Sequence, residues 1–323
     1  MFTFKEIYHA YLRCRKGKRN THNALKFETN LIENLCDLET SLNNRTYTPS
    51  RSVCFLTTSP KLREIFAADF GDRVVHHLIT PVLEQIYEPK FIHDSYSCRK
   101  EKGIHAAQKR AHQFSQSSDY YLQLDIKNFF YSIDKKRLFG MLNTTLVQRY
   151  DKVNTSSAIE LNEMLWILHT IIFHDVTKEA IIQGDKAHFN PIPPHKTLFK
   201  VPKGKGLPIG NLTSQFFANV YMNGLDNYCK RVLKCTQYLR YVDDFVIFDD
   251  SYERLLELKN RIEGYLHHQL GLQLRQPSCL RSVHAGLDFL GYISHANSYN
   301  LKNSVGVIPE SNPFDYTRDA LAL

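Results

Sequence analysis

The stretch RYVDDFVIFDD (residues 240–250) sets two neighbouring carboxylates, Asp243 and Asp244, inside an otherwise apolar run. Adjacent anions repel, and burying either of them without a partner is costly. The residues on both sides, QYLRY and FVIF, are typical of two β-strands, which predicts a hairpin with the aspartates at its tip. Because Asp is also a common turn residue, this stretch alone allows an ordinary polar turn as well as a cation site.

A third carboxylate lies at the end of another apolar strand. The segment YYLQLDI (120–126) is strand-like and carries Asp125 near its end. The elements after residue 120 follow the order β-α-α-β-β-α-β, which is typical of a split βαβ sheet with helices on one face. That order places strand 120–126 beside the hairpin and brings Asp125 near Asp243. Three carboxylates at one end of a sheet predict a site for two divalent cations that assist phosphoryl transfer.

The rest of the chain favours an α+β protein. Apolar residues at helical spacing predict helices over residues 4–15, 22–43, 72–87, 103–114, 133–146, 157–173, about 213–233 and 251–270. Further strands are expected at residues 53–56, 62–66, 272–274 and 287–294. Prolines concentrate in residues 185–208, which predicts an extended loop.

The composition favours a cytoplasmic protein with a polyanionic partner. The 323 residues include 41 Lys plus Arg against 33 Asp plus Glu, for a net charge of +8. The seven cysteines never occur as C-x-x-C, which indicates reduced thiols rather than a zinc site or a disulfide framework. No stretch approaches the roughly 20 apolar residues of a membrane span. The N-terminus lacks the continuous apolar core of a signal peptide, so no membrane contact is expected.

Seven motifs in order resemble those of reverse transcriptases. LDIKNFFYSID (124–134) resembles motif A, and YVDD (241–244) resembles the Y-x-D-D of motif C. A Y-x-D-D match alone is weak because four letters recur by chance, whereas seven ordered motifs spanning about residues 1 to 305 are specific. The other five segments lie in the fingers, the palm helix, motif D and the primer grip: residues 61–79, 95–107, 209–215, 270–274 and 287–294.

The palm-helix motif narrows the resemblance. Most of the superfamily has Q-G-x-x-x-S-P there, whereas this chain reads IGNLTSQ (209–215). Ile in place of Gln and S-Q in place of S-P is similar to the diversity-generating retroelement reverse transcriptases of phages and bacteria, within the group II intron-like superfamily. The resemblance implies a low-fidelity RNA-directed DNA polymerase that makes cDNA from a template-repeat RNA to diversify a target gene.

The resemblance also implies a fold and its division. It implies the right-hand fold of reverse transcriptases, with fingers and a palm built on the split βαβ sheet. The family continues into a helical thumb, whereas GVIPESNPFDYTRDALAL (306–323) is short, Pro-interrupted and largely polar, so the thumb is expected to be truncated or absent. Residues 1–119 would form the N-terminal helices and fingers. Residues 120–305 would form the palm, with 147–208 as a helical insertion of the fingers. Residues 306–323 would be a short tail in place of the thumb.

The site residues follow by matching each motif position. The metal ligands would be Asp125, Asp243 and Asp244, which are also the catalytic residues, together with the backbone of Ile126. An aromatic ring at Phe130 would exclude a ribose 2′-OH and so favour dNTPs, unless it is a core aromatic residue. The other residues expected at the dNTP are Arg63, Arg99, Lys102, Ile209, Gly210 and Gln215. The alternative for Arg63, Arg99 and Lys102 is that they are solvated surface residues with no ligand. The primer grip would be Phe289, Leu290, Gly291 and Tyr292, and further nucleic-acid contacts would come from Arg73, Tyr241, Lys203 and Lys205.

The chain departs from the family at motif D, which often carries a Lys that protonates the leaving pyrophosphate. The matching stretch LRQPSCL (274–280) has no Lys. Arg275 or Arg281 would substitute only electrostatically, because Arg does not readily give up a proton.

The expected cofactors are two Mg²⁺ ions, with Mn²⁺ as a substitute. The expected partners are template RNA, a primer or cDNA strand, dNTPs and an oligomeric basic accessory protein, in the cytoplasm of a bacterium or encoded by a phage. Two alternatives remain open at this point. One is a related bacterial reverse transcriptase in phage defence, and the other is a non-catalytic scaffold that binds nucleic acid.

Overall fold

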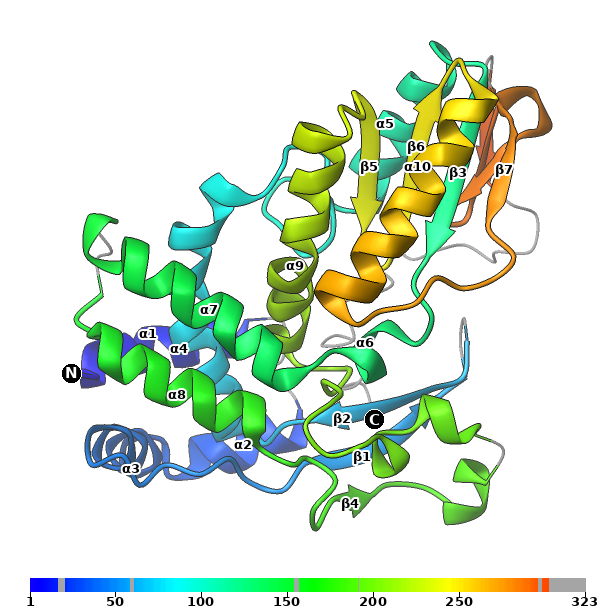
Figure 1. The fold of residues 1–323 in the computed structure, drawn as a ribbon. Helices are drawn as coiled ribbons and strands as arrows, with labels where there is room; N and C mark the ends of the chain where they lie inside the picture. Colours follow the sequence, from blue (N-terminus) through cyan, green and yellow to red (C-terminus); the bar gives the residue numbers. More distant parts are fainter. Residues whose placement is uncertain (17–20, 59–60, 154–156, 191, 296–297, 302–323) are drawn as a thin grey trace. The chain divides into compact units, whose positions relative to one another are not determined.

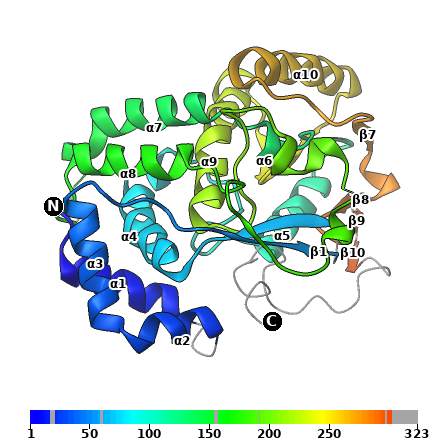
Figure 2. The same ribbon diagram turned by 90° about the horizontal axis from the view of Figure 1, so that it is seen from below.

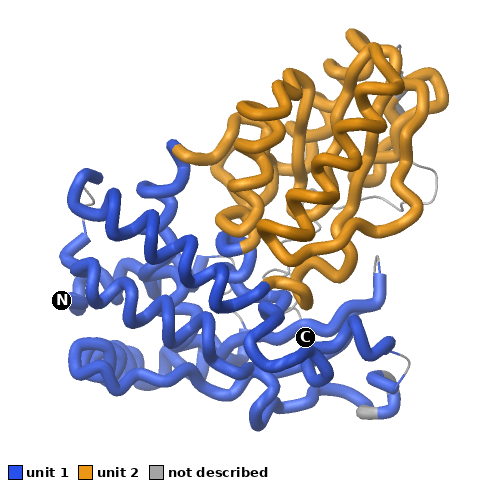
Figure 3. Tube along the Cα trace, viewed as in Figure 1, with its two compact units in different colours: residues 1–89, 134–217, 315–323 blue, residues 90–133, 218–314 orange. Residues whose placement is uncertain are grey.

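The computed structural model describes residues 1–16, 21–58, 61–153, 157–190, 192–295 and 298–301. Within these residues the chain forms two compact units (Figure 3). The first unit contains residues 1–89 and 134–217, and the second contains residues 90–133 and the described part of 218–314. The domain boundaries expected from the sequence stay a prediction, and the expected tail, residues 306–323, lies outside the described residues.

The first unit is mainly helical. Its N-terminal helix α1 starts with a capping box, in which the Thr3 hydroxyl accepts from the Glu6 backbone N–H and the Glu6 carboxylate accepts from the Thr3 backbone. The apolar face of α1 packs against α4 and α3 (Figures 1 and 2). The helices that begin in this unit are α1 (Phe4–Arg15), α2 (His22–Thr29), α3 (Leu31–Asn43), α4 (Phe70–Tyr87), α7 (Lys135–Arg149), α8 (Leu161–Phe173) and α9 (Leu212–Asn227).

A small sheet completes the first unit, in the strand order β2-β1-β4. Strands β1 (Val53–Thr57) and β2 (Arg63–Ala67) form an antiparallel hairpin, and β4 (Ile181–Ile182) pairs with β1 in parallel. The strand β4 has only two residues, which is too short to show a period in the sequence. Short 3-10 turns lie at Glu88–Lys90, Tyr150–Lys152, Lys186–Phe189, Pro194–Lys196 and Leu198–Lys200.

The second unit contains a four-stranded antiparallel sheet in the order β5-β6-β3-β7. Four consecutive residues of β6, Phe245 to Phe248, are all buried. Because successive side chains of a strand point to opposite faces, both faces of this sheet are covered. The strands are β3 (Tyr120–Asp125), β5 (Gln237–Tyr241), β6 (Asp244–Asp249) and β7 (Cys279–Ser282).

Helices α5 (Ile104–Ser115) and α10 (Tyr252–Tyr265) cover the two faces of that sheet (Figure 1). The expectation of helices on one face was therefore incomplete. The π-helical turns Tyr228–Val232 and Leu266–Leu270 extend α9 and α10, and the short helix α6 (Phe129–Ser132) follows β3. A 3-10 turn at Val283–Ala285 leads to a second small sheet of β8 (Leu287–Phe289), β9 (Tyr292–His295) and β10 (Ser298–Leu301).

Most predicted elements are present, with three differences. The helix predicted over 22–43 is divided at Asn30 into α2 and α3, because Asn30 has non-helical backbone angles of φ −123° and ψ 47°. Residues 272–274 contribute only an isolated bridge between Leu274 and Ile126 rather than a strand. The single strand predicted over 287–294 is a hairpin, because Leu290 and Gly291 both have positive φ. In the described part of the chain, no helix has the length and apolarity needed to cross a membrane.

Candidate active site

The predicted pairing of strand 120–126 with the 240–250 hairpin is present in the second unit. In the antiparallel ladder Asp125 is the register partner of Asp244, the first residue of β6. One step beyond, the Ile126 N–H donates to the Asp243 carbonyl at 3.2 Å. Directly paired residues of antiparallel strands have Cβ atoms about 4.5–5.5 Å apart. The ladder therefore places two of the three aspartates side by side and the third at the adjoining turn.

Each of the paired carboxylates also contacts a polar side chain. Asp125 Oδ2 lies 2.7 Å from Arg275 Nη1 in a half-exposed ion pair. The backbone supports this contact, because the Arg275 N–H donates to the Asp125 carbonyl at 2.7 Å. Asp244 accepts from the Gln123 amide at 3.2 and 3.3 Å. The positive charge of Arg275 offsets part of the repulsion between the paired anions.

The donor set fits a hard cation, but it is not gathered into a finished cation site. Carboxylate and carbonyl oxygens are the ligands that Mg²⁺ and Mn²⁺ prefer. Among the described residues, however, no three His, Cys, Asp or Glu side chains are grouped as a metal site. The register supplies the right atoms at one sheet end, and the side chains would have to turn toward a cation. The metal-binding role of Asp125, Asp243 and Asp244 stays a prediction.

Two neighbouring phenylalanines follow Asp125 in different environments. The short helix α6 begins after Asn128, whose left-handed φ of 51° turns the chain sharply. Phe129 is buried at 2% exposure, whereas Phe130 is half-buried. Their ring centroids are 5.5 Å apart in an edge-to-face contact. Phe129 is therefore a core residue, and Phe130 is the ring that remains reachable.

The expected phosphate-binding residues of the second unit contact nearby protein groups. The Arg99 guanidinium donates to the carbonyls of Ile92 at 2.7 Å and Ser95 at 2.8 Å. The Lys102 ammonium lies 5.1 Å from the centre of the Tyr96 ring. Both side chains are only partly exposed, so each would have to exchange some of these contacts to bind a triphosphate.

The residues of the palm-helix motif that are expected at the dNTP belong to the first unit. Ile209 is 9% exposed, and its carbonyl accepts from the Phe66 N–H at 2.9 Å. Gly210 has φ +117°, and a Cβ there would lie 2.9 Å from Ile65 Cγ2 and 3.1 Å from the Phe66 carbonyl oxygen. The turn is therefore packed against β2, where only glycine fits. Gln215 and Arg63, the first residue of β2, are partly exposed.

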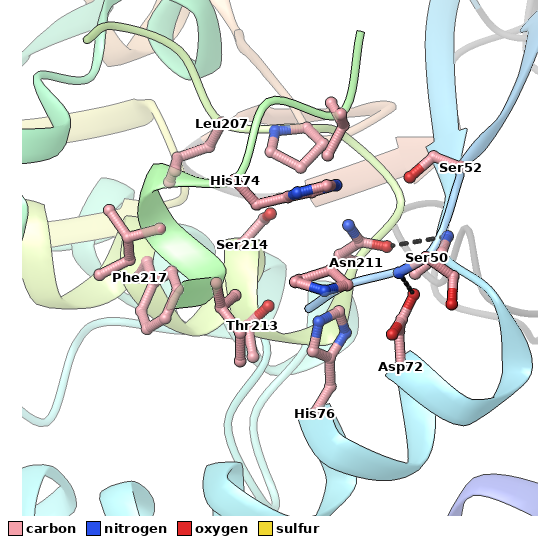
Figure 4. Close-up of a pocket in the computed structure, with 16 residues that line it drawn as sticks. Ser50, Ser52, Asp72, His76, His174, Leu207, Asn211, Thr213, Ser214 and Phe217 are labelled. Atoms are coloured by element: carbon pink, nitrogen blue, oxygen red, sulfur yellow. Dashed lines mark hydrogen bonds between the residues drawn. The ribbon is translucent and has the colours of Figure 1, made fainter. Parts of the chain in front are cut away.

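A cavity with both apolar and polar lining residues lies beside this turn and was not expected from the sequence (Figure 4). Asn211 faces it and accepts from the Ala68 N–H at 3.4 Å. Asp72 accepts from the Tyr47 hydroxyl at 2.6 Å and from the Ser50 N–H at 2.9 Å. Burial raises the pKa of Asp72 to about 6, despite these bonds, and burial lowers the pKa of nearby His76 to about 3. This part of the first unit therefore holds a neutral imidazole next to an easily protonated carboxyl.

The expected nucleic-acid contacts differ in accessibility. Lys203 and Lys205 are exposed on the loop that bridges to Asp134, and Arg73 is partly exposed and donates to the Ala68 carbonyl at 2.7 Å. Tyr241 is 1% exposed in the second unit, so its side chain packs in the core.

The expected primer grip coincides with the β8–β9 hairpin. Phe289 is buried, and Leu290, Gly291 and Tyr292 at and after the turn are partly exposed. The Leu290 carbonyl accepts from the Gln108 amide at 2.8 Å, which fastens the turn to α5.

An antiparallel sheet with a Tyr-Val-Asp-Asp hairpin paired to a second aspartate strand defines the palm of a template-dependent nucleic-acid polymerase. Residues 57–294, well over half of the chain, match the family described as reverse transcriptase (RNA-dependent DNA polymerase). The chain therefore belongs to the reverse transcriptase family.

Two curated proteins associated with introns are similar to most of this chain. The chain is 25% identical over 289 residues to the group II intron-encoded protein LtrA of Lactococcus lactis subsp. cremoris, covering 78% of this chain and 48% of that protein. It is 22% identical over 304 residues to an uncharacterized 91 kDa protein in a cob intron of Schizosaccharomyces pombe, covering 83% of this chain and 37% of that protein. The chain thus spans about half or less of the length of these relatives.

Solved structures share the fold. Apo telomerase from Candida tropicalis superposes with a TM-score of 0.54 at 11% identity, over 80% of this chain and 49% of that one. Telomerase from Candida albicans in complex with a fragment of telomeric RNA gives 0.53 at 11% identity, over 83% and 51%. The predicted α+β right-hand fold with fingers and palm is confirmed.

Proposed function

We propose that this chain is an RNA-directed DNA polymerase that copies a template-repeat RNA into cDNA for targeted gene diversification. The observation that carries the polymerase part is the register of the palm sheet, in which Asp125 pairs with Asp244 and Ile126 bonds to Asp243. Membership of the reverse transcriptase family supports RNA as the template. The diversity-generating part rests on the Ile209 and S-Q departures from the usual palm-helix motif.

The carboxylates of Asp125, Asp243 and Asp244, with the Ile126 carbonyl, would hold two Mg²⁺ ions, for which Mn²⁺ can substitute. Bound there, the ions supply Lewis-acid stabilisation of the attacking and leaving oxygens. The aspartates keep the ions in place, and the Phe130 ring excludes a ribose 2′-OH. In the reaction the primer 3′-oxygen forms a bond to the α-phosphorus of the dNTP. The bond between that phosphorus and the pyrophosphate oxygen breaks at the same time.

The side chain of Ile209 supports low fidelity. A glutamine there offers polar contacts to an incoming nucleotide, whereas isoleucine offers only van der Waals contact. A site that loses a positioned polar contact discriminates less between correct and wrong geometry. Ile209→Gln should therefore change the misincorporation frequency, and an unaltered error spectrum would remove this support.

The deciding experiment is primer extension on an RNA template, comparing wild type with Asp243→Ala and Asp243→Asn. We expect wild-type cDNA synthesis and a loss of about 10³-fold in both variants, because a missing ligand costs several kcal/mol of transition-state stabilisation. Equal thermal unfolding midpoints would show that the variants are folded. RNA binding without any Asp243-dependent extension would favour the scaffold alternative.

The subtype is tested by the same assay with the products sequenced, in the presence and absence of an oligomeric accessory protein. We propose that such a protein, encoded near this chain, completes the grip on the template and primer. Two results would support gene diversification. One is a template-repeat and variable-repeat pair near the gene for this chain, and the other is a higher error frequency in cDNA made by the wild type than in cDNA made by Ile209→Gln. The absence of such a repeat pair favours the phage-defence alternative.

A further inference from the structure

The strand that leads into the Asp243–Asp244 turn carries a completely buried ion pair. Arg240 and Asp226 both have 0% side-chain exposure. The pair is bidentate, with Arg240 Nε donating to Asp226 Oδ1 at 2.8 Å and Nη2 to Oδ2 at 2.7 Å. The Tyr238 hydroxyl donates to the same carboxylate at 2.7 Å. Asp226 lies near the end of α9, so the pair fastens this helix to β5.

The remaining donors of Arg240 reach the turn itself. Nη1 donates to the Val242 carbonyl at 2.8 Å and to Asn219 Oδ1 at 3.3 Å, and Nη2 donates to Ser95 Oγ at 3.2 Å. Val242 has φ +56°, a left-handed conformation that is a clear outlier for a β-branched residue. The guanidinium therefore bonds to the one residue of the turn whose backbone is under strain.

Arg240 is itself fixed through its backbone. Its N–H donates to the Asp94 carbonyl at 2.9 Å, and its carbonyl accepts from the Tyr96 N–H at 3.0 Å. On the far side of the turn, the Asp243 carbonyl accepts from Ile126. The turn is thus held at Val242 by a side chain and at Asp243 by the neighbouring strand, which leaves its aspartates little freedom to rotate as a group.

A buried charge pair needs a reason beyond stability. Replacing such a pair with apolar residues of similar volume is often neutral or stabilising. Burial by itself would lower the pKa of Arg240, but Asp226 raises it, so the guanidinium keeps its charge. Among side chains only Arg has enough donors in a rigid fork to bind a carboxylate with two bonds and still reach a carbonyl. The pair supplies a fixed donor at Val242 that an apolar core cannot supply.

We propose that Arg240, oriented by Asp226, is a positioning residue that holds Val242 in its left-handed conformation and so aims Asp243 and Asp244 at the bound cations. The inference rests on the proposed polymerase function for what those cations do. It assigns to α9 and β5 a direct influence on cation affinity, through one hydrogen bond to the turn.

The test compares Mn²⁺ binding, measured by electron paramagnetic resonance, with unfolding and with primer-extension kinetics. The main variant is Arg240→Met combined with Asp226→Leu and Tyr238→Phe, which leaves no unpaired buried charge. We expect a near wild-type unfolding midpoint, Mn²⁺ affinity weakened about 10- to 100-fold, and kcat lowered with the KM for dNTP unchanged. Wild-type Mn²⁺ affinity in this folded variant would overturn the proposal.

Three further variants keep the outcome decisive. Adding Val242→Gly to the triple variant should recover part of the Mn²⁺ affinity, since glycine adopts positive φ without strain. Arg240→Lys keeps the positive charge but lacks the planar guanidinium with several donors, so it should also weaken Mn²⁺ binding. This variant provides the test if the triple variant does not fold. Leu258→Ala removes a buried side chain of α10 and should lower stability without changing Mn²⁺ affinity. If Leu258→Ala weakens Mn²⁺ binding as much as the Arg240 variants, the effect follows stability and the proposal is wrong.

The same experiment distinguishes failure of the proposed polymerase function from failure of the positioning role of Arg240. Wild-type protein that binds Mn²⁺ through Asp243 but extends no primer contradicts the proposed function and leaves the positioning role standing. Wild-type protein without Asp243-dependent Mn²⁺ binding contradicts the positioning role.

Discussion

Arg275 forms an ion pair of 2.7 Å with Asp125, one of the three carboxylates expected to bind the catalytic ions. The contact joins residues 150 positions apart, and the backbone bond between the same two residues keeps them together. A guanidinium thus provides positive charge at the sheet end where the carboxylates meet.

We predict that Arg275→Gln strengthens Mn²⁺ binding. A divalent ion at Asp125 has to compete with the guanidinium, and removing that competitor leaves the carboxylate to the ion. Because the pair is half-exposed and screened by solvent, we expect a change of only about two- to fivefold in affinity. Mn²⁺ titration followed by electron paramagnetic resonance measures it, with Arg281→Gln on neighbouring β7 as the matched control. Weaker Mn²⁺ binding in Arg275→Gln would show that Arg275 supports the ion site instead of competing with it.

Phe130→Ala should relax the choice of sugar. The half-buried Phe130 ring is the accessible member of the aromatic pair, and its removal opens space for a 2′-OH. Steric exclusion of this kind is worth about 1–3 kcal/mol, which corresponds to roughly 10- to 100-fold in the rNTP to dNTP ratio. Single-nucleotide extension with dNTP and rNTP measures the ratio. Phe129→Leu should lower the unfolding midpoint and leave the ratio unchanged, and equal ratios in wild type and Phe130→Ala would contradict the role.

Gly210→Ala should destabilise the first unit. The added methyl group would meet the backbone of Phe66 in β2, which cannot move aside, and φ +117° is unfavourable for alanine. We expect a loss of about 1–3 kcal/mol in the free energy of unfolding. Gly140→Ala is the control, because nothing lies within 4 Å of a Cβ at that helical position. Urea unfolding of the two variants compares them, and equal midpoints would contradict the close approach at Gly210.

The pH dependence of stability should carry two opposing contributions from Asp72 and His76, which line the cavity of the first unit. His76 titrates at about 3 when folded against 6.5 when unfolded, so its contribution is lost as the pH falls below 6.5. Asp72 has its pKa raised from 3.8 to about 6, so the folded state gains a proton over the same range and stability rises as the pH falls. Between pH 6.5 and 5, His76 should lower the free energy of unfolding by about 2 kcal/mol, and Asp72 should raise it by about 1 kcal/mol.

Asp72→Asn removes the favourable contribution and leaves that of His76. The loss of unfolding free energy between pH 6.5 and 5 should therefore be steeper in Asp72→Asn than in wild type. Urea unfolding at the two pH values measures both slopes, and Asp72→Asn combined with His76→Gln should be the flattest. A wild-type slope steeper than that of Asp72→Asn would contradict the raised pKa of Asp72.

The sequence alone determined the palm. Apolar runs next to turn residues identify the strand 120–126 and the hairpin at 240–250, and the order of elements between them allows few ways to assemble a sheet. Because pairing follows from that order, the proximity of Asp125 to the hairpin was predictable. The family resemblance came from seven ordered motifs, which local residue identity is enough to detect.

Only the tertiary structure decided which side chains surround those aspartates. The sequence does not reveal which residues contact one another around the site. Such contacts join Asp125 to Arg275, Arg240 to Asp226 and Val242, and Asp72 to Tyr47. A charged residue in an apolar strand signals that something must pair with it, but not what does. Pairing depends on distance and burial in three dimensions, because an ion pair forms between whichever groups the packed backbone brings within reach of each other.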